Sequence, residues 1–100
     1  MTPLENYYCG DEAFAHLIAA ISPLIESARA EWPAWPNLVA LCGDDEQLAR
    51  GVFYVADVNA LAWMRTPAPV LDGLSAVDCL STTSGQHRLK EAILRYGGMT

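Results

Sequence analysis

Apolar side chains spaced three and four residues apart predict a long amphipathic helix in the first third of the chain. Between residues 11 and 31 this spacing places one set of side chains on a single helical face. Asp11 and Glu12 favour the start of that helix, because carboxylates are stabilised at the positive end of the helix dipole. Pro23 predicts a kink, because it removes one backbone donor. The apolar face comprises Phe14, Leu17, Ile18, Ile21, Leu24, Ile25 and Ala28.

The stretch that follows combines two tryptophans with two prolines. Residues 31–36 read EWPAWP, and a rigid break is predicted because proline does not fit the interior of a helix. We expect the indoles of Trp32 and Trp35 to cap the core at a corner between helices. A tryptophan-rich surface for a partner protein is the alternative, because tryptophan is a favoured interface anchor.

Short helical segments are predicted between this break and residue 56. Asn37 is a suitable cap for a short helix that Gly43 ends, and Asp44 followed by Gln47 resembles a capping box for the next helix. Residues 51–55 (GVFYV) also have the composition of a strand. A helix is favoured there, because no neighbouring stretch offers a strand partner and an isolated strand is not stable.

Proline and glycine punctuate the chain between residues 57 and 73 (DVNALAWMRTPAPVLDG). Asp57 is predicted to cap a short helix. Pro67 must end that helix by residue 65 or 66, because proline excludes the residue before it from the α region. Pro69 stiffens the next segment, and Gly73 supplies a turn position without a Cβ atom. The helix is expected to pack through Val58, Leu61, Ala62 and Trp63.

A one-turn helix is predicted next, over residues 76–80. Ser75 is placed to cap it, with Val77 and Leu80 inward and Asp78 outward. Four small hydroxyl residues then introduce the last helix.

This last helix is predicted over about residues 84–96 and is closed by Gly97 and Gly98. Its expected buried face is Leu89, Ala92, Ile93 and Tyr96, and its outward side chains are Arg88, Lys90, Glu91 and Arg95. The predicted fold class is therefore all-α, a compact bundle of about five short helices.

The second half of the chain resembles the toxin-binding domain of the Xre/MbcA/ParS antitoxin family. That family has an acidic residue, a helix with a tryptophan, a Thr-Pro-x-Pro sequence, a Leu-x-Gly turn, a short helix and a last helix ending in glycine. The matching residues are Asp57, Ala60, Trp63, Met64, Thr66, Pro67, Leu71, Gly73, Ser75, Leu80, Gly85, Ile93, Leu94 and Gly97. Ala76 departs from the pattern, which usually has proline there. The resemblance implies a toxin-binding domain over residues 57–100, preceded by a helical region over residues 1–56.

Charge is distributed unevenly between these two parts. Residues 1–56 carry eight acidic side chains and two arginines, a net charge of 2 − 8 = −6, whereas residues 57–100 carry four acids and four bases and are neutral. Members of the family usually place a DNA-binding helix-turn-helix ahead of the toxin-binding part, and such a module must neutralise phosphates with Lys and Arg. We therefore expect no recognisable DNA-binding motif in residues 1–56, and no binding to nucleic acid by this chain alone.

The sequence lacks the residue patterns typical of membrane-spanning, secreted, metal-binding and catalytic proteins. No apolar run reaches the length of a membrane span, and the start of the chain lacks the features of a secretory signal, so a cytoplasmic location is expected. The three cysteines (Cys9, Cys42, Cys79) and two histidines (His16, His87) are too widely spaced for a zinc site. Neither a phosphate-binding loop nor a nucleophile motif is found. We expect no catalytic residue, metal or cofactor, and hence no enzyme.

The resemblance implies that the chain neutralises a protein toxin. The expected partner is a RES-type toxin, which attacks NAD or uses it to modify a target, and the family's C-terminal domain covers the cleft of the toxin's active site. The candidate toxin-binding positions are Arg88, Lys90, Arg95, Tyr96, Gly97 and Gly98, with a tail to Thr100 whose carboxylate would take the place of a phosphate. The basic side chains also suit a solvated face near a helix C-terminus. The alternatives are a DNA-binding autorepressor with a degenerate helix-turn-helix in residues 11–56, and an oligomerisation module that forms homodimers.

Overall fold

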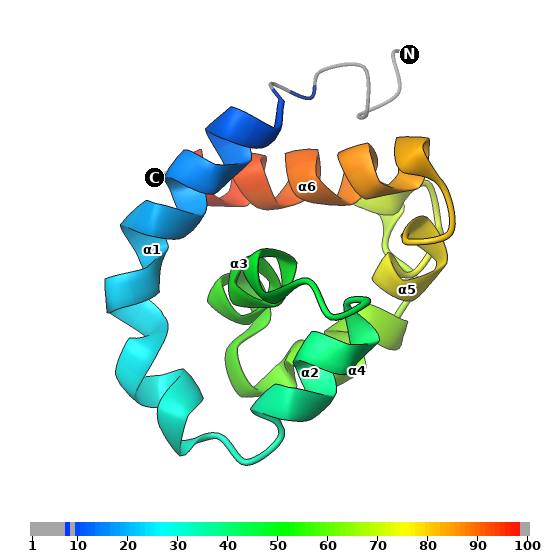
Figure 1. The fold of residues 1–100 in the computed structure, drawn as a ribbon. Helices are drawn as coiled ribbons and strands as arrows, with labels where there is room; N and C mark the ends of the chain where they lie inside the picture. The colour runs from blue at the N-terminus through cyan, green and yellow to red at the C-terminus, as the bar shows by residue number, and fades with distance from the viewer. Residues whose placement is uncertain (1–7, 9, 99–100) are drawn as a thin grey trace.

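The regular structure of the chain is helical throughout the described residues. The computed structural model describes residues 8 and 10–98, which contain six α-helices, two 3-10 helices and no strand. Figure 1 shows α3 in the middle of the molecule, with the other α-helices arranged around it. The all-α prediction is confirmed. The elements are α1 (Asp11–Glu31), α2 (Trp35–Leu41), α3 (Glu46–Ala56), η2 (Asp57–Asn59), α4 (Ala60–Arg65), η3 (Pro69–Leu71), α5 (Ala76–Cys79) and α6 (Thr83–Gly98).

The first helix, α1, has the bounds that its apolar spacing predicts. It buries Phe14, Ile18, Ile21 and Ile25. The predicted apolar face was too wide, because Leu24 and Ala28 are exposed: they lie to one side of the row that packs on the core. The helix continues through Pro23, and the hydroxyl of Ser22 donates to the carbonyl of Ile18 at 2.6 Å. The kink at Pro23 stays a prediction.

Both tryptophans lie at the corner between α1 and α2, as predicted. The rings of Trp32 and Trp35 are half-buried and pack on Phe53 of α3, with centroid distances of 5.3 Å and 6.1 Å. The guanidinium of Arg29 lies 5.1 Å from the centroid of Trp35. These contacts support the interpretation of the corner as part of the core.

The start of α2 differs from the prediction. The helix begins at Trp35, so Asn37 lies inside it and does not cap it. Pro36 explains the earlier start, because proline is favoured in the first turn of a helix, where its missing N–H is not needed. Gly43 has a φ of 73°, which fits its predicted role after the end of this helix.

The central helix, α3, is capped one residue later than predicted. Asp45 accepts a hydrogen bond from the backbone N–H of Leu48 at 3.1 Å, whereas Asp44 has a φ of 63° and belongs to the turn. Residues 51–55 are helical, which confirms the prediction of a helix there. The buried residues of α3 are Leu48, Ala49, Gly51, Val52 and Phe53.

The segment after α3 contradicts the predicted role of Asp57. This residue has a φ of 53° and follows the last residue of α3, and α4 begins only at Ala60 after the 3-10 turn η2. The turn changes the helical phase, so α4 buries Ala60 and Met64 and leaves Val58 exposed. The prediction was wrong for Val58 and Ala62, which are exposed, whereas Leu61 and Trp63 are half-buried and pack on the core as predicted. The end of α4 at Arg65 is as predicted.

The turn from η3 to α5 follows the prediction closely. Gly73 has a φ of 79°. Ser75 and Asp78 form a capping box, in which the Ser75 hydroxyl accepts from the Asp78 N–H at 3.2 Å and the Asp78 carboxylate accepts from the Ser75 N–H at 3.3 Å. The buried residues of α5 are Ala76 and Cys79, whereas the predicted inward residues, Val77 and Leu80, are half-buried.

The last helix, α6, is longer than predicted at both ends. Thr82 accepts from the N–H of Gly85 at 2.9 Å, and the helix runs from Thr83 through Gly98. Gly97 and Gly98 therefore extend the helix and do not close it. Glu91 was predicted to face outward but is buried, and Tyr96, predicted inward, is exposed.

One hydrophobic cluster joins the two parts of the chain. It includes Phe14 and Ile18 of α1, the buried apolar side chains of α3, and Leu89 and Ile93 of α6. The division into residues 1–56 and 57–100 stays a prediction. None of the described helices is long and apolar enough to cross a membrane.

Candidate functional site

The basic side chains predicted to bind a partner lie along α6, and two of them fasten this helix to other elements. Arg88 Nε lies 3.7 Å from a carboxylate oxygen of Asp72, in the turn after η3. Lys90 Nζ lies 3.4 Å from Asp11 Oδ1, at the start of α1, and 5.4 Å from the centroid of the Phe14 ring. Their side chains are 13% and 17% exposed, so both contribute to packing within the chain.

Side chains at the C-terminal end of α6 are more exposed to solvent than those of Arg88 and Lys90. The Arg95 side chain is 47% exposed and its Nε lies 3.0 Å from Glu91 Oε2. The other carboxylate oxygen of Glu91, Oε1, is buried and has no hydrogen-bond partner within the described part of the chain. Tyr96 is 51% exposed, and its ring lies edge-on to that of Tyr54 of α3 with a centroid distance of 5.9 Å. The backbone of Gly97 and Gly98 continues the helix, and Thr100 lies outside the described residues.

The start of α1 is held against the middle of α6 by aromatic and charged contacts. Tyr8 stacks on His87 with a centroid distance of 4.6 Å, and its hydroxyl donates to Asp11 at 2.6 Å. Burial, followed by that hydrogen bond, raises the pKa of Tyr8. The hydrogen bond from Tyr8, followed by the charge of Lys90, lowers the pKa of Asp11. Tyr8 thus packs on the core.

An apolar groove, which we call the α6 groove, opens beside Tyr96. It has a volume of about 410 Å³ and draws on α3, α4, η3 and α6. Val70 and Tyr96 are exposed at this groove, and Arg95 is its one charged lining residue. Our sequence analysis missed the groove because its walls come from four separate elements. Its lining residues are Val55, Trp63, Val70, Ala92, Ile93, Arg95 and Tyr96.

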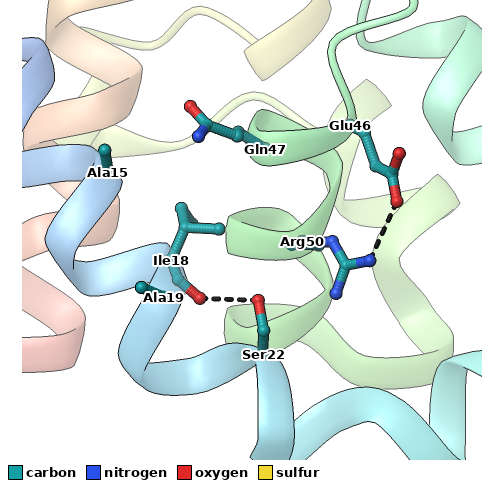
Figure 2. A pocket seen from close by; sticks show the side chains of 7 residues that line it. All are labelled: Ala15, Ile18, Ala19, Ser22, Glu46, Gln47 and Arg50. Carbon is teal, nitrogen blue, oxygen red and sulfur yellow. Dashed lines mark hydrogen bonds and ion pairs between the residues drawn. The ribbon is translucent and has the colours of Figure 1, made fainter.

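A second hollow, between α1 and α3, is more polar (Figure 2). It has a volume of about 360 Å³ and is lined by Ala15, Ile18, Ala19, Ser22, Glu46, Gln47 and Arg50. The guanidinium of Arg50 is bound by Glu46 at 2.9 Å and by Glu26 at 3.3 Å, and these carboxylates raise its pKa. Because its charged groups are paired with one another, this hollow offers no cluster suited to catalysis.

The described residues meet neither the requirements of a metal site nor those of a reactive thiol. No group of three or more His, Cys, Asp and Glu side chains within them is arranged to hold a metal ion. Cys42 is buried, and its pKa is raised to about 12 by desolvation first and by the charge of Asp45 second. A thiol with such a pKa is a poor nucleophile at neutral pH.

The residues that carry the family resemblance mostly shape the corner from α4 to α6. Leu71 and Met64 are buried, Trp63 is half-buried at the α6 groove, and Leu80 packs on the core. Thr66 follows α4 with an extended backbone, and its hydroxyl donates to the carbonyl of Ala62 at 2.7 Å. Together with Pro67, Gly73 and Ser75, these residues determine where α6 begins.

Comparison with known proteins identifies this corner and its flanking helices. The family model described as the antitoxin Xre/MbcA/ParS C-terminal toxin-binding domain matches residues 37–98. The match begins ahead of the region that carries the sequence motifs, because it includes α3 and most of α2, and it leaves out α1. No curated protein and no solved structure gives a significant match. Since the matched residues make up more than half of the chain, it belongs to the Xre/MbcA/ParS antitoxin family and contains the toxin-binding domain of that family.

Proposed function

We propose that this antitoxin neutralises a RES-type toxin, which consumes NAD, by covering the toxin's active site with the C-terminal end of α6. Family membership indicates a protein toxin as the partner, and a binding role rather than catalysis. The observation that carries the finer proposal is the exposure of Arg95 and Tyr96 at the end of α6, next to an apolar groove. Arg88 and Lys90 contribute indirectly, because their ion pairs with Asp72 and Asp11 hold α6 in place.

The composition of this surface suits the blocking of a dinucleotide site. Such a site holds a ligand with charged phosphates and stacked rings, so its walls are polar and partly aromatic. A protein segment that occupies it must bury matching apolar area and leave no charge unpaired. Tyr96 supplies an aromatic ring, and the guanidinium of Arg95 already has a carboxylate beside it in Glu91.

Two further observations weigh against the DNA-binding alternative. The helix that follows the turn of a helix-turn-helix must enter the major groove, but α3 lies at the centre of the fold and buries much of its surface (Figure 1). The turn before it carries Asp44 and Asp45, and Glu46 begins the helix; phosphates would repel all three carboxylates. Homodimer formation is compatible with toxin binding.

Co-expression with a RES-type toxin tests the proposal. The unmodified chain should restore growth and cellular NAD, whereas a chain that ends at Tyr96, and the double variant Arg95→Glu with Tyr96→Ser, should not. Arg65→Glu is the matched control, because Arg65 is an exposed arginine on α4 outside the predicted surface. A cut after Arg88 would be uninformative, because it removes the buried Leu89 and Ile93. Full protection of growth and NAD by both altered chains would refute the role of the end of α6.

A further inference from the structure

We infer that the α6 groove is the pocket into which the toxin inserts a hydrophobic side chain, with a carboxylate of the toxin placed beside it to meet Arg95. This inference rests on the proposed function, because it names the anchor of the same toxin. The complex would then have two contacts, one at the toxin's active site and one at the α6 groove. The end of α6 would block the catalytic centre, and the groove would hold the two proteins together.

The lining of the α6 groove is suited to an apolar anchor. Six of its seven lining residues are apolar, and Val70 and Tyr96 leave 51% of their surface in solvent. Its volume of about 410 Å³ lies within the range of roughly 300–1,000 Å³ that is usual for sites that enclose small ligands. Covering exposed apolar surface is favourable, and hot spots of interfaces tend to be side chains that fill such pockets.

The position of the groove in the chain indicates which partner fills it. All its lining residues lie within residues 37–98, the part that matches the toxin-binding domain. Another strongly exposed apolar side chain, Leu24, lies on α1 outside this match. The groove is also continuous with Tyr96, which the proposed function places at the toxin's active site. A toxin bound there would bury both surfaces in one interface.

The charge at the groove indicates the chemistry of the partner segment. Arg95 is the one charged lining residue, with a half-exposed side chain, whereas the chain as a whole has a net charge of −6. An acidic residue next to the inserted side chain would share the half-exposed guanidinium of Arg95 with Glu91, because a guanidinium has five N–H donors, while basic residues of the toxin would be attracted to other faces. Complementary charges of this kind fix the orientation of a complex more than they raise its affinity.

Calorimetry of the purified chain with its proposed partner, a catalytically inactive form of a RES-type toxin, tests the inference. Val70→Asp should weaken binding roughly tenfold or more, because it places a charge against the inserted apolar side chain, and Val70→Ala should weaken it by a smaller factor. Arg95→Gln should weaken binding and reduce its dependence on salt. Thermal unfolding of each variant establishes that it is folded.

Two variants serve as matched controls. Val58→Asp lies within the matched domain but outside the groove, and Leu24→Asp lies outside the domain; these side chains are 60% and 74% exposed. Both should bind within about twofold of the unmodified chain, a difference that corresponds to roughly 0.4 kcal/mol.

The possible outcomes separate the inference from the proposed function. If the unmodified chain does not bind this toxin, the proposed function and the inference both fail. If it binds and both Val70 variants bind equally well, the inference fails alone. Sedimentation tests whether a second copy of this chain occupies the groove instead. If the unmodified chain is a dimer that Val70→Asp converts into monomers, and the affinity for toxin is unchanged, the inference is overturned in favour of self-association.

Discussion

Replacing Gly85 by alanine should destabilise this protein far more than the chemical change suggests. Gly85 is buried in the first turn of α6, where that helix crosses α5. A Cβ atom at this position would lie 2.2 Å from the backbone oxygen of Cys79 and 2.9 Å from its carbonyl carbon and Cα. Real Cβ atoms essentially never approach another atom within 3.0 Å, so the two helices must move apart by at least 3.0 − 2.2 = 0.8 Å.

The surroundings of α5 determine the size of this effect. The contact is with backbone, which cannot rotate away as a side chain can, and α5 is fixed by the capping box of Ser75 and by the burial of Ala76 and Cys79. Overpacking of a core costs about 1–3 kcal/mol, and alanine returns at most about 1 kcal/mol through its higher helix propensity. We expect a net loss of about 2 kcal/mol in the free energy of unfolding, which lowers the Tm by roughly 8–16 °C for a chain of this size.

Gly51→Ala is the matched control, because Gly51 is also a buried glycine within a helix. Its added Cβ would meet side-chain atoms only, the Cγ2 methyl of Ile93 and the ends of Ile18 and Phe14, at 3.2–3.3 Å. Side chains can yield by a few tenths of an ångström, and the gain in helix propensity offsets the remaining cost, so the Tm should change by less than about 5 °C. Circular dichroism at 222 nm during heating measures the Tm of both glycine variants. If Gly85→Ala melts within about 3 °C of the unmodified chain, or if the two variants lose equal stability, the reasoning about the close approach of α5 and α6 is wrong.

Three further predictions concern a helix cap, a charged contact between helices and a buried thiol. Ser75→Ala removes the hydroxyl that caps α5 and should lower the free energy of unfolding by about 1 kcal/mol in urea titrations; an unchanged midpoint would contradict this. Asp11 has a lowered pKa, so its contribution to stability is present above about pH 4 and is lost as the pH falls through its folded-state pKa. The Tm difference between the unmodified chain and Asp11→Asn should therefore be larger at pH 7 than at pH 3, and an equal difference would exclude the contacts with Tyr8 and Lys90 as its source. Cys42, whose pKa is raised to about 12, should react with iodoacetamide at pH 8 only as fast as the protein unfolds, as mass spectrometry of quenched samples can measure.

Elements whose signals are local were predictable from the sequence. The bounds of α1 follow from its apolar spacing and its acidic first turn, and the end of α4 follows from Pro67. Ser75 could be recognised as a cap because it directly precedes a short helix, where its hydroxyl can accept a hydrogen bond from a backbone N–H of the first turn. In each case a few neighbouring residues decide the conformation, so no knowledge of the tertiary structure is needed.

Features that depend on distant contacts were not predictable in this way. Asp57 has the chemistry of a helix cap, but α3 extends up to it and leaves it with a positive φ of 53° in the linking turn. Glu91 looks like a surface residue of α6, yet it is buried and paired with Arg95. The α6 groove depends on four elements that only the fold brings together.

The structure also changes how the family motif relates to binding. Few of its residues offer side chains to a partner: Leu71 and Met64 are buried, and Gly73 serves a turn. Their common effect is to set the direction in which α6 leaves the corner, and Gly85 sets how closely that helix lies against α5. A small rotation of α6 would carry Arg95 and Tyr96 away from Trp63 and Val70, so the α6 groove exists only while the corner is intact. Gly85→Ala should accordingly weaken toxin binding even at temperatures where the variant remains folded, whereas Gly51→Ala should not.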